Sequence, residues 1–246
     1  MIGQESEQKR LVDVFDNYYY KDLSETNKKL PISANSILDL FNDFLVMSQV
    51  IYSLIDNDKE DLPNMKILDA GCGNGRMLRK MCELGARPFN CTGIDLSHDI
   101  VEYARLNSPE GIYYYSGDIK NMPFDNDEYD IILNMGVLIH ILDNNYIKEI
   151  AKEFYRVLKP GGLIFITVAN EGTTWKDEKI QSMTRSFSMD KIKELFDMFE
   201  CLGIYNAYSD RYQGEYNVSL EYSHILKAFE IGAVNASYKL IVLKKD

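Results

Sequence analysis

The stretch KILDAGCGNGR, residues 66–76, predicts a strand, a tight turn and the start of a helix. The apolar pair Ile67 and Leu68 ends in Asp69, and three glycines follow at alternate positions before the helical pattern MLRKMCEL begins. Glycines are needed where the backbone takes a positive φ or where a ligand approaches too closely for a Cβ atom. The helix start offers unpaired N–H groups to such a ligand. On its own this is a weak signal, because any α/β protein can contain a glycine-rich turn.

The glycine spacing distinguishes between the glycine-rich motifs that are known to bind nucleotides. A dinucleotide fingerprint has glycine at its first, third and sixth positions, and counting from Gly71 the sixth position is Arg76. A P-loop requires Gly-Lys-Ser/Thr, which does not follow here. The pattern D-x-G-x-G-x-G instead resembles the first motif of the class I S-adenosylmethionine (SAM)-dependent methyltransferases. The resemblance implies that the loop cradles the methionine half of the cofactor, and that Asp69 helps to set the loop and the amino group.

Composition limits the classes to which the chain can belong. At 246 residues, with 46% hydrophobic and 26% charged residues, it fits one large soluble domain. A net charge of −11 without a dense Lys/Arg run argues against a nucleic-acid partner. Residues 1–10 lack a secretory signal, and the longest apolar run, 163–169, is too short to span a membrane. Four scattered cysteines predict reduced thiols, so we expect a cytoplasmic protein without a membrane partner.

Strand and helix patterns alternate through the middle of the chain. This alternation predicts an α/β fold: a Rossmann-like, doubly wound, seven-stranded and mostly parallel sheet with helices on both faces. Ligands on such a sheet bind beyond the carboxyl ends of the strands. Strands are predicted near 67–69, 90–95, 111–116, 130–134, 162–169, 202–209 and 237–243, and helices at 75–84, 98–106, 144–157 and 189–199.

The segments outside this alternation predict the domain organisation. Helical spacing begins near Ser33, and the polar, proline-containing stretch 57–64 separates it from the sheet. We therefore expect an N-terminal helical cap or lid over residues 1–60 and a SAM-binding core over 61–246. The long stretch before the last strand predicts an acceptor-side insertion over 205–236, with an added helix at 220–231.

Three acidic residues, Asp69, Asp95 and Asp118, follow three successive strands and therefore lie along one edge of the predicted sheet. Asp95 can accept hydrogen bonds from both hydroxyls of a ribose, with Leu96 against an adenine face. Asp118 can accept from an adenine amino group, while the backbone N–H of Ile119 serves a ring nitrogen. A single acid after a strand more often faces solvent or caps a helix. Three together favour a nucleoside-binding site.

Later motifs extend the resemblance over residues 65–170. YDIILNMGVLIHI, residues 129–141, matches the family's fourth motif, which implies that Asn134 and Met135 lie beside the methionine moiety. EFYRVLKPGGLIFIT, residues 153–167, resembles the stretch leading into the fifth strand. The chain is identified as a member of the class I SAM-dependent methyltransferases of the small-molecule type. The predicted cofactor-binding residues are Asp69, Gly71, Cys72, Gly73, Asn74, Asp95, Leu96, Asp118, Ile119, Asn134, Met135, Tyr19 and Tyr20.

The resemblance implies an enzyme that moves a methyl group from SAM to an oxygen or nitrogen of a small-molecule or saccharide-like acceptor by in-line displacement. His140 is the candidate base for an oxygen acceptor. Many relatives carry a histidine pair there, and Ile139 takes the first place here. A histidine held structurally at the sheet edge is the alternative. The sequence contains no cluster of metal ligands, so a metal-dependent enzyme is not expected.

Tyrosines are concentrated outside the cofactor core. Of seventeen, many fall in 18–20 and 205–222, which predicts a lid and a wall for a polar organic acceptor. A contact in a homodimer is the alternative. Two other function classes stay open. One is a non-catalytic SAM-binding partner subunit with the same fold, which the intact glycines and acids disfavour. The other is a nicotinamide oxidoreductase, which Arg76 disfavours.

Overall fold

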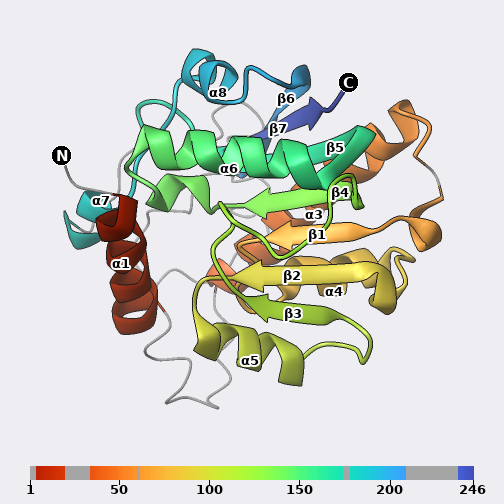
Figure 1. Ribbon diagram of the computed structural model, residues 1–246, viewed down its shortest axis with the longest axis horizontal. Coiled ribbons are helices and arrows are strands. Elements are labelled where there is room, and N and C mark those ends of the chain that lie inside the picture. Colours follow the sequence, from red (N-terminus) through yellow and green to blue (C-terminus); the bar gives the residue numbers. More distant parts are fainter. Residues whose placement is uncertain (1–3, 20–33, 60, 174–177, 209–237) are drawn as a thin grey trace.

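A seven-stranded sheet with helices on both faces forms the computed structural model (Figure 1), which describes residues 4–19, 34–59, 61–173, 178–208 and 238–246. The strand order is β3-β2-β1-β4-β5-β7-β6, and β7 runs antiparallel to both of its neighbours while the other pairs are parallel. The predicted mostly parallel, doubly wound sheet is thus confirmed. The strands are β1 (Ile67–Ala70), β2 (Cys91–Asp95), β3 (Tyr113–Ser116), β4 (Tyr129–Met135), β5 (Leu158–Ala169), β6 (Glu200–Tyr208) and β7 (Tyr238–Lys244).

The helices form two layers, one on each face of the sheet, and an N-terminal pair that consists of α1 and η1. In Figure 1 the strands β1 to β4 point toward α1, so the N-terminal pair lies at their carboxyl ends. The longer helices are α1 (Gln4–Val14), α3 (Ala34–Asp56), α4 (Arg76–Glu83), α5 (His98–Leu106), α6 (Asn144–Val157), α7 (Glu178–Met183) and α8 (Met189–Leu195). The short ones are the π-helix η1 (Phe15–Tyr19) and the 3₁₀ turns η2 (Leu62–Asn64), η3 (Pro88–Asn90) and η4 (Leu138–His140).

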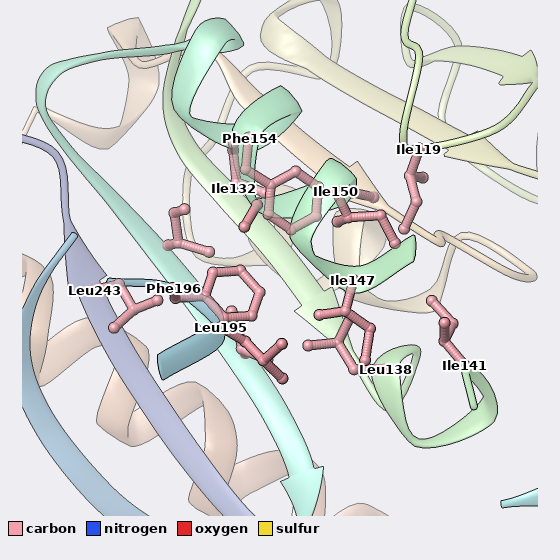
Figure 2. Close-up of a cluster of buried hydrophobic side chains, with 14 of the residues drawn as sticks. Ile119, Ile132, Leu138, Ile141, Ile147, Ile150, Phe154, Leu195, Phe196 and Leu243 are labelled. Atoms are coloured by element: carbon pink, nitrogen blue, oxygen red, sulfur yellow. The ribbon is translucent and has the colours of Figure 1, made fainter. Parts of the chain in front are cut away.

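Alternate residues of the central strands face opposite helical layers. Leu68 and Ile132 pack with α6 and α8 in one cluster, part of which Figure 2 shows. Ile67 and Leu133 pack with α3, α4 and α5 in the other. Burial of one such side chain stabilises the fold by about 1.5–3 kcal/mol. Because both faces are covered, the central strands are apolar along their length, which is typical of a parallel sheet.

Helix α6 follows from its local sequence. Asp143 caps its start by accepting a hydrogen bond from the backbone N–H of Asn145 at 2.8 Å. Its buried face carries Tyr146, Ile147 and Phe154 along with other apolar residues. The predicted bounds of α6 and α5 are those observed.

Other boundaries differ from the prediction because tertiary pairing sets them. Strand β5 begins at Leu158, not at 162, since Leu158 pairs with Tyr129 before a bulge restores the register. Helix α8 ends at Leu195, and Phe196 already has a φ of −119°. Helix α3 shares its buried side chains with the sheet in one apolar cluster, so it is a covering layer of the sheet. The division of the chain at residue 60 stays a prediction, and the expected helix at 220–231 lies outside the described residues.

Within the described ranges, the helices are all too short or too polar to cross a membrane. All four cysteines are free thiols.

Candidate functional site

A cavity of about 240 Å³ lies at the carboxyl ends of the first four strands. It is lined by residues that follow β1, β2, β3 and β4, and it is closed on one side by Leu11 of α1 and Phe15 of η1. The sequence therefore predicted the location of the cavity, because parallel strands end at one edge of the sheet. The predicted site residues that line it are Gly71, Asp95, Leu96, Asp118, Ile119, Met135 and His140.

The glycine loop after β1 has a backbone that side chains would disturb. Gly71, Gly73 and Gly75 have φ values of 85°, 48° and 77°. A Cβ atom on Gly71 would lie 2.3 Å from a methyl carbon of Val137, which also lines the cavity. The backbone N–H groups of Gly71 and Cys72 donate to the Ile94 carbonyl at 2.8 and 3.0 Å. The loop is thus fixed to β2, and Val137 occupies the position that a side chain at Gly71 would need.

Asp95 is held by backbone donors. Its Oδ2 accepts from the N–H of Gly73 at 2.8 Å and its Oδ1 from the N–H of Ser97 at 3.1 Å. Burial raises the pKa of Asp95, and these donors oppose that rise. Each carboxylate oxygen has a second lone pair, so the group can still accept hydrogen bonds from a ligand's hydroxyls.

Asp69 and Asn134 lie beneath the loop and are fully buried. Burial and, after it, the charge of Asp95 raise the pKa of Asp69 to about 7, and Arg76 opposes this. Asp69 Oδ2 finds no hydrogen-bond partner within the described part of the chain. Asn134 Nδ2 donates to the Ala70 carbonyl at 2.7 Å. A buried carboxylate oxygen of this kind is costly unless a donor reaches it, so Asp69 fits a cationic ligand group.

Asp118 makes contacts with two elements. Its Oδ1 accepts from the backbone N–H of Lys120 at 3.0 Å, and its Oδ2 accepts from the Tyr146 hydroxyl at 2.5 Å. Tyr146 lies on α6 and lines the cavity. The sequence places Tyr146 on the buried face of a helix, but it contains no signal that the hydroxyl reaches this acid.

His140 lies in η4, at the side of the cavity that Phe15 covers. The two rings are 5.1 Å apart in an edge-to-face arrangement. Burial, and after it the charge of Arg10, lowers the pKa of His140 to about 4. The imidazole is therefore neutral at physiological pH, and its unprotonated ring nitrogen can accept a proton.

Polar contacts attach α1 and η1 to the strand ends. Glu7 Oε1 accepts from the N–H of Leu142 at 2.8 Å and pairs with Arg10, which also donates to the His140 carbonyl. Ser97 Oγ donates to Asp16 at 2.5 Å, directly beside Asp95.

Some predicted site residues lie outside the cavity or outside the described residues. Cys72 and Asn74 stay in the glycine loop, where Asn74 Oδ1 accepts from the Arg76 N–H at 3.1 Å. Tyr19 ends η1, its side chain is outside the described part, and Tyr20 is outside it entirely. Leu11 and Phe15 were missed, because residues 1–30 are too polar for their apolar members to form a clear periodic face.

Comparison with known proteins agrees with this geometry. Residues 67–162 match a family model described as a methyltransferase domain. The chain is similar to the ubiquinone biosynthesis O-methyltransferase of Bartonella tribocorum (strain CIP 105476 / IBS 506), with 35% identity over 117 residues, 46% of this chain and 44% of that protein. It is also similar to the tRNA (carboxymethyluridine(34)-5-O)-methyltransferase of Arabidopsis thaliana, with 37% identity over 112 residues, 44% of this chain and 25% of that protein. The matched region thus spans less than half the length of these curated relatives.

Solved structures share the fold at low sequence identity. Magnesium protoporphyrin IX methyltransferase from Synechocystis PCC 6803, crystallised with bound SAH, gives a TM-score of 0.66 at 14% identity over 98% of this chain and 100% of that one. A SAM-dependent methyltransferase from Archaeoglobus fulgidus gives 0.61 at 15% identity over 93% of this chain and 100% of that one. At these identities the likeness is one of fold.

Proposed function

We propose, since residues 67–162 match a family model described as a methyltransferase domain, that this chain is a class I SAM-dependent enzyme that methylates a hydroxyl of a small organic acceptor. The observation that carries the proposal is the convergence of Gly71, Asp95 and Asp118 on one cavity edge, with Asp69 fully buried beneath the glycine loop. A binding fold that had lost its cofactor would have no reason to keep a buried carboxylate oxygen, Asp69 Oδ2, that finds no partner among the described residues.

The residues of this edge would hold SAM in three parts. Asp69 would pair with the amino group of its methionine half from beneath the loop, and the cavity beside Gly71 would take the adjoining chain. Asp95 would accept the ribose hydroxyls, since two backbone donors already hold its carboxylate. Asp118 and Ile119 would bind the adenine edge. The assignment of Cys72, Asn74, Asn134, Met135, Tyr19 and Tyr20 to cofactor binding stays a prediction.

SAM supplies an electrophilic methyl group on a sulfonium, so the protein contributes alignment and exclusion of water. Leu11 and Phe15 cover one side of the cavity and would exclude water there. His140 would accept a hydrogen bond from the acceptor's hydroxyl and take its proton as the new O–C bond forms. Its low pKa keeps the imidazole neutral, and it predicts that the acid limb of the activity profile lies near pH 4, well below the 6.5 of an ordinary histidine.

The choice of an oxygen acceptor is supported by the relatives, which are O-methyltransferases by name. A small acceptor is supported by the ubiquinone-pathway relatives and by the net charge of −11, which opposes binding of a polyanion. Because one relative is named as a tRNA methyltransferase, RNA is the alternative acceptor that the test has to include.

The test measures binding and transfer separately. We expect calorimetry to give a dissociation constant for SAM and its demethylated product SAH in the micromolar range, and no binding of NAD. Methyl-labelled SAM should then label a panel of hydroxylated aromatic compounds, and His140→Gln should lower that rate about 100-fold or more with little change in SAH affinity. Binding without transfer to any acceptor would favour a non-catalytic partner subunit, and labelling of RNA alone would overturn the small-molecule assignment.

A further inference from the structure

The hydrogen bond between Tyr146 and Asp118 joins two elements across the cavity. Tyr146 comes from the first turn of α6, and Asp118 from the loop after β3. The 2.5 Å bond to Oδ2 and the 3.0 Å bond from the Lys120 N–H to Oδ1 give each carboxylate oxygen one fixed donor. The side chain is therefore held in a single orientation at the wall of the cavity.

The proton of this bond stays on the tyrosine. Burial, then the bond to Asp118 and the charges of Asp118 and Glu7, raise the pKa of Tyr146 far above the physiological range. Lys120 is the one cation close to the pair among the described residues, with Nζ 3.9 Å from Asp118 Oδ2 and 4.4 Å from the centre of the Tyr146 ring. Tyr146 thus donates its hydroxyl proton to Asp118. Toward a ligand, the remaining lone pairs of the carboxylate can therefore only accept hydrogen bonds.

We propose that Tyr146 is a positioning residue that makes the cavity specific for a 6-aminopurine. This inference rests on the proposed function, because it concerns the nucleoside half of the cofactor. A carboxylate fixed as a pure acceptor binds the amino group at position 6 of adenine. It repels the carbonyl oxygen of a 6-oxopurine, since two acceptors then face each other without a proton.

Removal of the Tyr146 hydroxyl frees one carboxylate oxygen. Lys120 then becomes the strongest remaining partner, and Asp118 can turn toward its ammonium group. The adenine amino group loses an oriented acceptor. A 6-oxopurine loses nothing, because it made no favourable contact with the carboxylate in the first place.

The experiment compares SAH with S-inosyl-L-homocysteine, which carries an oxygen in place of the amino group. Isothermal titration gives both dissociation constants for the wild type, for Tyr146→Phe and for Tyr155→Phe, a matched control on the same helix whose ring contacts Lys245 and Phe199 instead. We expect the wild type and the control to prefer SAH by at least tenfold. In Tyr146→Phe the dissociation constant of SAH should rise about tenfold and that of the inosine analogue by less than twofold.

The outcomes separate this inference from the proposed function. Equal weakening of both ligands in Tyr146→Phe would indicate a purely structural role for the hydroxyl and would overturn the inference, as would an unchanged preference. A wild type that binds SAH and the inosine analogue equally would also overturn it while leaving the proposed function intact. A wild type that binds neither would overturn both. Circular dichroism of each variant establishes that the fold is kept.

Discussion

Two regions enclose the cavity, and they are built in different ways. The binding rim, which consists of the glycine loop and the ends of β1, β2 and β3, is held by backbone hydrogen bonds to neighbouring strands. The covering segment, α1 with η1, is held by side chains: Glu7 contacts Leu142, Arg10 contacts His140 in η4, and Asp16 contacts Ser97. Opening the rim would break the sheet, whereas opening the covering segment would break side-chain contacts and expose the buried Leu11. The structure therefore combines a rim that backbone hydrogen bonds hold with a cover that side chains hold.

The largest effect is expected where a side chain enters the rim. Gly71→Ala should lower SAH affinity at least 100-fold, because the new Cβ would meet Val137 at 2.3 Å and φ is 85°. Gly172→Ala is the matched control, since φ is 86° there and no atom lies within 4 Å of the new Cβ. Titration of both proteins with SAH checks this, and near-normal affinity in Gly71→Ala would remove the loop from the binding site.

The next largest effect tests the ribose assignment. Asp95→Ala should weaken SAM binding by about 1.5–3 kcal/mol, since hydrogen bonds to a charged acceptor contribute that much. Asp99→Ala removes an exposed acid four residues along the chain, and it should leave affinity unchanged. If calorimetry gives the same dissociation constant for both variants, Asp95 does not contact the ribose.

Much of this rim could be read from the sequence. Its glycines and acids follow strands whose ends a parallel sheet brings together, so local pattern and topology were sufficient. The covering segment could not be read in this way. Leu11 and Phe15 are isolated apolar residues in a polar stretch, and Arg10 acts through contacts with η4, which lies 130 residues along the chain. The contact of Tyr146 with Asp118 could not be predicted for a related reason. The position of Tyr146 on a buried helix face already accounts for its apolar ring.

A pH-dependent effect on folding stability is expected at Asp69. Its folded pKa of about 7 exceeds the ordinary 3.8, so the folded state binds more protons between these values and stability falls as pH rises through that window. Asp69→Asn removes this penalty. Without ligand it should match the wild type near pH 4 and exceed its free energy of unfolding by about 2–4 kcal/mol at pH 8. Urea denaturation at both pH values measures the difference, and an equal difference at both would contradict the raised pKa.

The smallest effect concerns the covering segment. Asp16→Ala should change global stability by no more than about 1 kcal/mol, because it removes one hydrogen bond at the surface. Hydrogen exchange in α1 should nevertheless become faster, and SAH should slow it in the wild type. Asp13→Ala, which loses a contact with the exposed Asn17 in the described part of the chain, is the control. Exchange in α1 that does not respond to SAH would mean that the segment is not a lid.

The antiparallel strand β7 has a consequence for the order of assembly. It is the last of the seven strands in the chain, yet it lies between β5 and β6. On a ribosome, β6 therefore emerges before β7, the strand with which it pairs among the described residues. Until Tyr238–Lys244 has been made, the growing chain exposes the edge of β5, an apolar strand that could pair with another nascent chain. Completion of this sheet therefore waits for the synthesis of Tyr238–Lys244.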